Sequence, residues 1–192
     1  MVYLIQKPPY PIMVKDVHDV KRKVVAYAPN VVCAFGIRSS EAALVEMLFI
    51  QHPKAFRYLT ANIALLRGSG RKHLRALAAH ADALQCNESE ARTLLELSGG
   101  RTLTAHDAQT IAATYKVERV VITCGPQGSV AYWDEELFTV PAYPIPQPEA
   151  IDATGAGDVF AAGVIDSYFV RDLDPRTALG IASYCGAMNC KA

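Results

Sequence analysis

A run of small residues leading into an acidic residue and an apolar helix is the part of the sequence best suited to chemistry. Thr154-Gly155-Ala156-Gly157 stands directly before Asp158. The N–H groups of such a loop converge at the start of the helix, where the helix dipole strengthens the attraction for an anion. Asp158 falls in the first helical turn, where a carboxylate stays ionised. An ionised carboxylate beside an anion site fits a general base that activates a nucleophile attacking a bound phosphoryl group.

The same segment has an interpretation that needs no ligand, in which the glycines form a tight loop and Asp158 only complements the helix dipole. Two other segments also have both a structural and a functional interpretation. Asn87 and Glu90 have the spacing of a capping box, and they also follow an expected strand at the edge where ligand sites of α/β proteins form. The stretch from Gly125 to Gly128 is either a plain turn or a second loop at that edge.

Nucleotide-binding motifs of other folds are absent from the sequence. The pattern G-x-x-x-x-G-K-[ST] does not occur, because its nearest match, 67–75, lacks both the spacing and the hydroxyl. The dinucleotide fingerprint fails because Phe160 stands where a third glycine is needed. The histidines show no metal-ligand spacing with each other or with the cysteines. The sequence therefore favours neither a P-loop nor a dinucleotide fold, and the histidines do not predict a metal site.

Three motifs, in order, resemble the PfkB (ribokinase-like) family of sugar and nucleoside kinases. The stretch DATGAGDVFAAG, which starts at Asp152, is similar to the family's C-terminal signature. VVITCGPQGSVAYW (120–133) is similar to its strand–turn–strand, and CNESEA (86–91) is similar to its N-x-x-E motif. The resemblance implies an α/β fold with a doubly wound, mainly parallel sheet and helices on both faces. It also implies a kinase that transfers phosphate from ATP to a hydroxyl of a small sugar or nucleoside.

The resemblance gives each matching residue a role. Asp158 is the expected catalytic base, and the loop of Gly155, Ala156 and Gly157 is the expected anion hole. The expected contacts of Mg²⁺ and ATP are Asn87 and Glu90, which organise the metal partly through water, Thr123, Gly125 and Gly128 at the phosphates, and Ser183 near the adenine. Asp152 and Thr154 match positions that bind a monovalent cation such as K⁺ in some relatives.

The resemblance covers the chain from about residue 31 to its end. The substrate-binding N-terminal portion of the family, with its Gly-Gly motif and β-lid, has no counterpart, because the adjacent glycines Gly99-Gly100 follow a helix and match a helix cap. The sequence thus also allows a second function, a non-catalytic nucleotide-binding remnant or fragment of such a kinase. A third possibility is an unrelated α/β nucleotide-binding enzyme that shares only the anion loop.

Composition restricts the class of protein and its partners. The chain has 192 residues, of which 51% are hydrophobic and 20% charged, and we expect one domain over 1–192 with an irregular lead-in over 1–30. Lysine plus arginine equals aspartate plus glutamate at 19 each, which argues against nucleic acid or an anionic membrane as partner. Neither a signal peptide nor a membrane anchor is evident at the N-terminus. Five scattered cysteines in apolar segments indicate a reduced, cytoplasmic protein.

Strand-like and helix-like runs alternate from residue 31 onward, which predicts βαβ units. The expected strands are 24–27, 31–37, 56–63, 82–86, 118–123 and a hairpin joined across 134–136. The expected helices start near Ser40 and cover 73–81, 87–97, 105–115, 158–169 and 178–190. The run 31–37 is apolar and would form an unpaired sheet edge. We therefore expect the chain either to self-associate or to cover this edge with residues 1–30.

Overall fold

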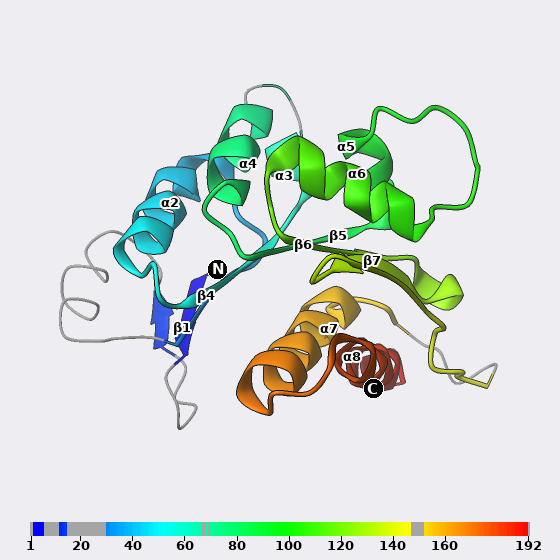
Figure 1. Cartoon of the computed structure of the whole chain (residues 1–192). Helices are drawn as coiled ribbons and strands as arrows, with labels where there is room; N and C mark the ends of the chain where they lie inside the picture. The colour runs from blue at the N-terminus through cyan, green and yellow to red at the C-terminus, as the bar shows by residue number, and fades with distance from the viewer. Residues whose placement is uncertain are drawn as a thin grey trace.

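The apolar strand runs of the sequence form one eight-stranded sheet, and helices cover both of its faces (Figure 1). A computed structural model describes residues 2–5, 12–14, 30–66, 68, 70–146 and 152–191. The strands are β1 (Val2–Ile5), β2 (Ile12–Val14), β3 (Val31–Ala34), β4 (Phe56–Thr60), β5 (Ala83–Asn87), β6 (Arg119–Thr123), β7 (Ser129–Trp133) and β8 (Glu136–Val140). Their order in the sheet is β2-β1-β3-β4-β5-β6-β7-β8. The α/β class is confirmed, and the strand expected at 24–27 lies outside the described residues.

The four central strands, β3 to β6, run parallel to one another. Most of their residues are buried, because a parallel sheet is covered on both faces, and this explains their continuous apolar sequence. These strands follow one another in chain order, so right-handed crossovers place all of the connecting helices on one face. These helices are η1 (Ser39–Glu41), α2 (Ala42–Gln51), α3 (Ile63–Leu66), α4 (Gly70–Ala78), α5 (Glu88–Leu94) and α6 (Ala105–Tyr115).

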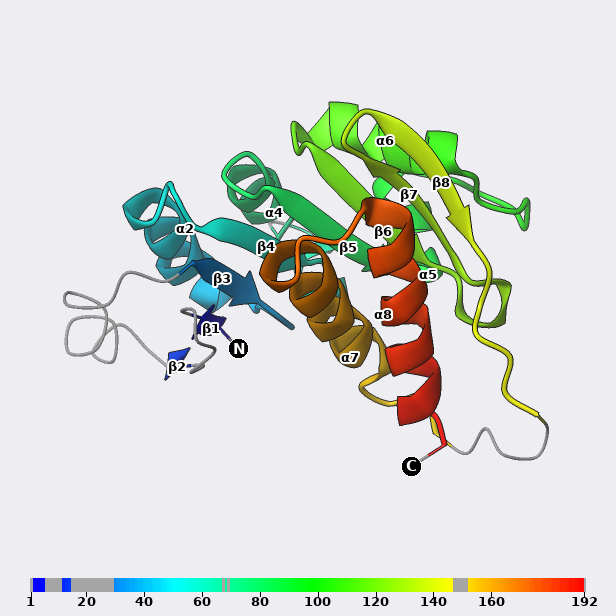
Figure 2. The same ribbon diagram turned by 60° about the horizontal axis from the view of Figure 1, so that its bottom comes forward.

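The C-terminal helices cover the opposite face of the sheet (Figure 2). They are α7 (Ala156–Val164), which continues into the π-helix η3 (Ile165–Val170), and α8 (Pro175–Asn189). The helix expected to start at Asp158 starts two residues earlier, because Gly155 adopts a left-handed conformation (φ 81°) and serves as its N-cap. The helices α7 and α8 pack closely at Gly163, where a Cβ would lie 2.8 Å from the Cα of Ala182.

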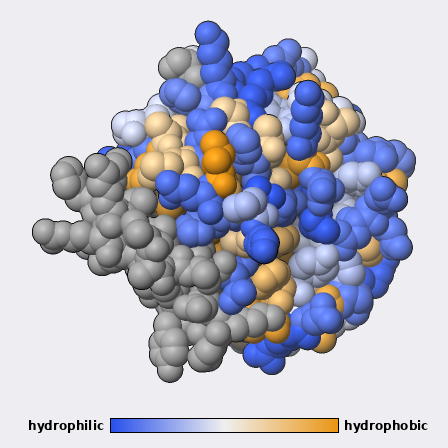
Figure 3. Space-filling model, turned by 60° about the vertical axis from the view of Figure 1, so that its left-hand side comes forward, coloured by the Kyte–Doolittle hydropathy of each residue, from blue (hydrophilic) through white to orange (hydrophobic). Residues whose placement is uncertain are grey.

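Apolar side chains form a core cluster on each face of the sheet. One lies beneath α2 to α6 and includes Leu48, Leu74 and Ile111, and the other lies beneath α7 and α8 and includes Tyr58 and Trp133. None of the described helices combines the length and the apolar character that crossing a bilayer requires. The side of the molecule that carries α2 is mainly hydrophilic, with apolar residues scattered among the polar ones (Figure 3).

Antiparallel strands complete the sheet at both edges. Beyond β6, the strands β7 and β8 form the expected hairpin. At the other edge, β1 pairs with β3 from Val2 opposite Ala34 to Ile5 opposite Val31, and β2 pairs with β1. The edge of β3 is therefore covered by residues within 1–30, which confirms one of the two expected outcomes. The η2 turn (Gly125–Gln127) links β6 to β7.

Candidate active site

A cleft of about 210 Å³ opens where the carboxyl ends of the parallel strands meet the start of α7. This is the edge at which open α/β sheets bind ligands. The cleft is lined by Gly36, Thr60, Ala61, Asn62, Gln85, Cys86, Asn87, Glu90, Thr123, Gly157 and Asp158. Five of these, Asn87, Glu90, Thr123, Gly157 and Asp158, are residues that the sequence singled out. The three motifs, which are far apart in the chain, thus meet in one place.

The start of α7 offers free N–H groups to this cleft. The N–H of Ala156 donates to the carbonyl of Ala153 (3.1 Å), and the N–H of Val159 donates to the carbonyl of Gly155 (2.9 Å). No hydrogen bond within the described residues uses the N–H of Gly157 or Asp158. Within the predicted 155–157 loop the Ala156 N–H is thus already engaged, whereas the N–H groups of Gly157 and Asp158 remain available to an anion. Anion binding by this loop remains a prediction. The carboxylate of Asp158 lies at the same end of the helix and is exposed.

Gly155 and Gly157 differ in what requires a glycine. The φ of Gly155 is 81°, a conformation that other residues rarely adopt. Gly157 has no such backbone constraint, and the nearest neighbour of a Cβ placed there would be the Gln85 Nε2 at 3.7 Å. Nothing within the described protein therefore excludes a side chain at position 157. Gly157 lines the cleft, so the absence of a side chain there suits a ligand that approaches the backbone closely.

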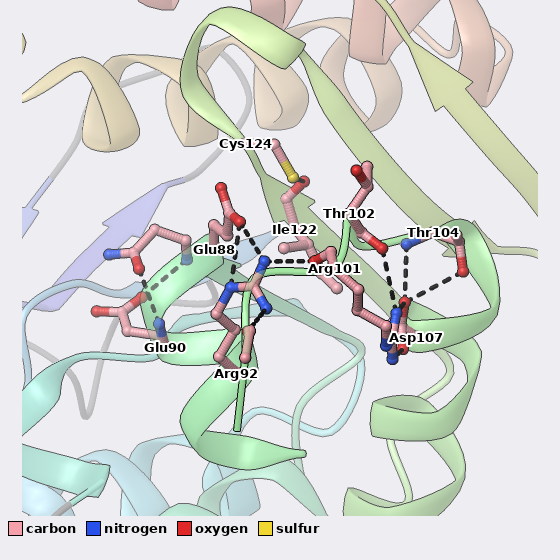
Figure 4. Close-up of polar contacts among 11 residues, drawn as sticks. Glu88, Glu90, Arg92, Arg101, Thr102, Thr104, Asp107, Ile122 and Cys124 are labelled. Carbon is pink, nitrogen blue, oxygen red and sulfur yellow. Dashed lines mark hydrogen bonds and ion pairs between the residues drawn. The ribbon is translucent and has the colours of Figure 1, made fainter. Parts of the chain in front are cut away.

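Asn87 and Glu90 form the capping box that their spacing predicts. The N–H of Glu90 donates to the Asn87 Oδ1, and the N–H of Asn87 donates to the Glu90 Oε2, both at 2.9 Å. Figure 4 shows Glu90 at the start of α5. Burial raises the pKa of the Glu90 carboxyl, although the hydrogen bond from Asn87 opposes the shift. The structural and the functional interpretations of this motif are compatible, since the capping box holds both side chains at the wall of the cleft.

Thr123 ends β6 directly opposite Asn87 in the sheet register. The glycines that follow it lie in or next to the η2 turn and have positive φ angles, 55° at Gly125 and 92° at Gly128. At Gly128 a Cβ would lie 2.1 Å from the carbonyl oxygen of Val140, so the approach of the chain after β8 already requires glycine there. At Gly125 the neighbouring space is open. Their predicted contact with nucleotide phosphates remains a prediction.

The loop between α5 and α6 is held by two arginines (Figure 4). Arg92 pairs with Glu88 (2.7 Å) and donates to the carbonyls of Gly99 (2.8 Å) and Arg101 (2.5 Å). Arg101 forms a two-pronged ion pair with Asp107 in the first turn of α6, at 2.5 and 2.8 Å. Its hydrogen bonds lower the pKa of the Asp107 carboxyl to about 2. This network fixes the N-terminal ends of both helices.

Seven predicted site residues lie outside the lining of the cleft: Gly125, Gly128, Asp152, Thr154, Gly155, Ala156 and Ser183. The Asp152 Oδ1 accepts from the N–H (2.8 Å) and the hydroxyl (2.7 Å) of Thr154, and these bonds lower the pKa of the Asp152 carboxyl. The hydroxyl of Ser183 donates to the carbonyl of Pro141 (3.2 Å) and accepts from the N–H of Tyr143 (3.1 Å). Ser183 thus ties α8 to the chain after β8. The proposed cation and adenine contacts remain predictions.

Six residues of the cleft were not predicted as site residues: Gly36, Thr60, Ala61, Asn62, Gln85 and Cys86. Gly36 and Asn62 follow the ends of β3 and β4, but they fall inside the longer strand runs expected at 31–37 and 56–63, so the overestimated strand ends hid them. Gln85 is harder to find, because it lies inside a strand among apolar residues. Its only signal in the sequence is a polar residue in the run ALQC.

The oxygen groups of the cleft suit Mg²⁺ held mainly by a phosphate ligand. No group of three His, Cys, Asp or Glu side chains converges as a metal site within the described residues. Mg²⁺ commonly needs only one or two carboxylates, with water and substrate phosphates completing its shell. Glu90 can supply such a carboxylate, because within the described chain only its Oε2 carries a hydrogen bond. Asn87 lies beside it.

A helix N-terminus, an exposed carboxylate and several oxygen groups meet in a cleft at the carboxyl ends of the parallel strands, an arrangement compatible with a phosphate ligand. Comparison with known proteins agrees: the chain belongs to the pfkB family of carbohydrate kinases, whose model matches residues 25–192. The ribokinase-like fold that the motifs implied is thereby confirmed, with helices on both faces of the sheet.

Individual relatives are similar over part of their length. The chain is 35% identical over 109 residues to a cytidine kinase of Thermococcus kodakarensis, covering 56% of this chain and 37% of that protein. It is 26% identical over 163 residues to a fructokinase of Escherichia coli, covering 78% and 50%. A putative ribokinase II from E. coli, solved with ATP and Mg²⁺, superposes with a TM-score of 0.59 at 26% identity, covering 74% and 44%. The chain spans half or less of these curated relatives.

Proposed function

We propose that the protein takes part in ATP-dependent phosphorylation of a hydroxyl group on a small sugar or nucleoside. The observation that carries this proposal is the placement of Asp158 and two free N–H groups of α7 in one cleft with Asn87, Glu90 and Thr123. Relatives named as a fructokinase and a cytidine kinase support both acceptor classes. The structure of a relative with ATP and Mg²⁺ supports the choice of phosphate donor.

The residues of the cleft divide the chemistry between them. Asp158 takes the proton of the acceptor hydroxyl as the hydroxyl oxygen forms its bond to the γ-phosphorus. The bond from that phosphorus to the bridging oxygen breaks, and its electron pair leaves with ADP. The N–H groups of Gly157 and Asp158 stabilise the charge on the transferring group, in a position that needs no rearrangement during the reaction. Asn87 and Glu90 would hold Mg²⁺, which would neutralise phosphate charge when bound.

A substrate panel tests this proposal. The full-length product of the gene is mixed with MgATP and each of a set of sugars and nucleosides, and ADP formation is followed. We expect one acceptor class to give turnover far above the ATPase background. Tight MgATP binding without turnover on any acceptor would instead support the non-catalytic nucleotide-binding alternative. Absence of MgATP binding would refute both.

A further inference from the structure

A chain of two hydrogen bonds, one buried and one partly buried, connects the sheet to the first turn of α7. The Gln85 Nε2 on β5 donates to the carbonyl oxygen of Gly157 (2.8 Å), and the hydroxyl of Tyr58 on β4 donates to the Gln85 Oε1 (2.7 Å). Gln85 is 4% exposed and Tyr58 is fully buried. The three residues come from distant parts of the chain and meet beneath α7, which lies over this part of the sheet (Figure 2).

The donor and acceptor chemistry allows one orientation of the Gln85 amide. The carbonyl of Gly157 can only accept, so the amide nitrogen must face it. The amide oxygen then faces Tyr58, whose hydroxyl must donate. If the hydroxyl were absent, the amide oxygen would be buried without a partner, and the amide could turn. Tyr58 therefore fixes the direction in which Gln85 donates.

Gln85 is buried inside the central sheet, where its register partners are Thr60 of β4 and Val121 of β6. On the same face Ala83 precedes it, and both Ala83 and Val121 belong to the core cluster beneath α7 and α8. A buried amide in such surroundings is costly unless it is hydrogen-bonded, and an apolar residue would avoid that cost. The polar link occurs where α7 begins, at the cleft. Its location thus points to the geometry of the helix start rather than to general stability.

The Gly157 carbonyl and the Asp158 N–H belong to one planar peptide group. A hydrogen bond that holds the carbonyl therefore also fixes the direction of the N–H. Donation to the carbonyl polarises the peptide group, so the N–H becomes a stronger donor. We propose that Gln85, oriented by Tyr58, is a positioning residue that aims and strengthens the Asp158 N–H toward a phosphate group in the cleft. The role of phosphate rests on the proposed function.

Two variants of the 192-residue chain test this role. Gln85→Met keeps the length of the side chain but removes both polar groups, and Tyr58→Phe removes only the orienting hydroxyl. NMR reports the Asp158 amide directly, and calorimetry gives the Kd for MgATP. We expect the Asp158 ¹⁵N resonance to move in both variants, and further in Gln85→Met. The Kd should rise about 3- to 10-fold in Gln85→Met, the effect of losing one neutral hydrogen bond. In the double variant, Tyr58→Phe should add nothing.

A matched control separates positioning from loss of stability. Ile111→Val destabilises the core on the opposite face, where the side chain is fully buried, without contact with α7. Positioning by Gln85 predicts an unchanged Asp158 resonance and Kd in this control. The proposal is overturned if the Asp158 resonance does not move in Gln85→Met. It is also overturned if the wild type binds MgATP and Gln85→Met has the same Kd as Ile111→Val. If the wild-type chain does not bind MgATP, the proposed function fails, and the Asp158 resonance still decides whether Gln85 positions the helix start.

Discussion

Asp158 is the residue on which binding and chemistry can be separated. Asp158 lines the cleft, whereas the groups proposed to hold the phosphate are backbone N–H groups that no side-chain substitution removes. Asp158→Asn keeps the size of the side chain but cannot accept a proton. We expect kcat to fall about 10²- to 10⁴-fold, the usual effect of losing a general base, with little change in the Kd for ATP.

The measurement compares kcat and nucleotide Kd in the full-length gene product. Asp166→Asn is the matched control, because Asp166 lies in η3, away from the cleft, and pairs with Arg171 at the surface. Unchanged turnover in Asp158→Asn would exclude this residue as the base. A large loss of ATP affinity without a change in fold would make it a binding residue instead.

A side chain at position 157 should increase stability but weaken ligand binding. A methyl group at position 157 meets only the Gln85 Nε2 at 3.7 Å, and glycine in a helix costs roughly 0.5–1 kcal/mol relative to alanine. Gly157→Ala should therefore raise the free energy of unfolding by about that amount. It should also weaken MgATP binding by roughly tenfold, because the methyl group occupies the path of the phosphate.

Gly180→Ala is the control for this change, since Gly180 lies in α8 with open space around its Cβ. It should give a similar gain in stability, measured by urea unfolding, with no change in Kd. Gly155→Ala should lose stability, because alanine is strained at φ 81°. Unaltered MgATP affinity in Gly157→Ala would mean that the ligand does not approach this part of the backbone.

Single residues show where prediction from sequence ends. Asp158, Asn87 and Glu90 could be placed in one site because their motifs follow expected strands or begin expected helices. Gln85 could not, because a role that depends on contacts with residues 27 and 72 positions away leaves no local pattern. The requirement for Gly128 likewise comes from Val140 of a neighbouring strand.

At the scale of elements, the start of α6 depends on charge. Thr104 caps the helix, and the Asp107 carboxylate accepts from the Thr104 N–H (2.8 Å) as well as from Arg101. Because the pKa of Asp107 is about 2 in the folded protein and ordinarily 3.8, the ionised form favours folding. This contribution is complete above about pH 4 and is lost as the pH falls toward 2.

Asp107→Asn should therefore lower the free energy of unfolding by about 1–2 kcal/mol at neutral pH, a magnitude typical of a charged hydrogen bond and a cap. The difference from the wild type should shrink between pH 4 and pH 2. Urea unfolding at several pH values measures it. Glu135→Gln, which removes an exposed carboxylate in the turn after β7, controls for net charge. If the difference in the free energy of unfolding between the variant and the wild type stayed constant with pH, the ionised Asp107 carboxylate would not be the stabilising group.

Element boundaries differ from the expectation where loops hold the chain. The helix expected over 87–97 ends at Leu94, because Glu96 turns into a left-handed conformation (φ 55°) and Arg92 holds the loop that follows. Gly99-Gly100 therefore lies beyond the helix end rather than forming its cap. Such ends depend on contacts with later residues, whereas the interiors of the strands follow from their own apolar runs.

At the scale of the whole molecule, the sheet has two different edges. β8 follows β7 through a tight turn, which the local sequence predicts well. At the other edge, β1 and β2 are joined to β3 by antiparallel pairing. From the sequence, an exposed strand edge was expected at 31–37, with coverage by residues 1–30 as one of two outcomes. No pattern within 1–30 indicated which residues would pair with that edge. Pairing of β1 with β3 depends on a partner strand rather than on local periodicity.

Removal of residues 1–14 should therefore expose the backbone of β3. Unpaired, apolar edge strands recruit other chains. We expect the shortened chain to self-associate in a concentration-dependent way and the full chain to do so less, as measured by light scattering after size-exclusion chromatography. Ile50→Glu in the shortened chain is the control, because Ile50 is 54% exposed on α2 and offers a different apolar contact. Association that persists in this variant points to the strand edge. A shortened chain that stays monomeric at all concentrations would show that β1 is not needed to protect β3.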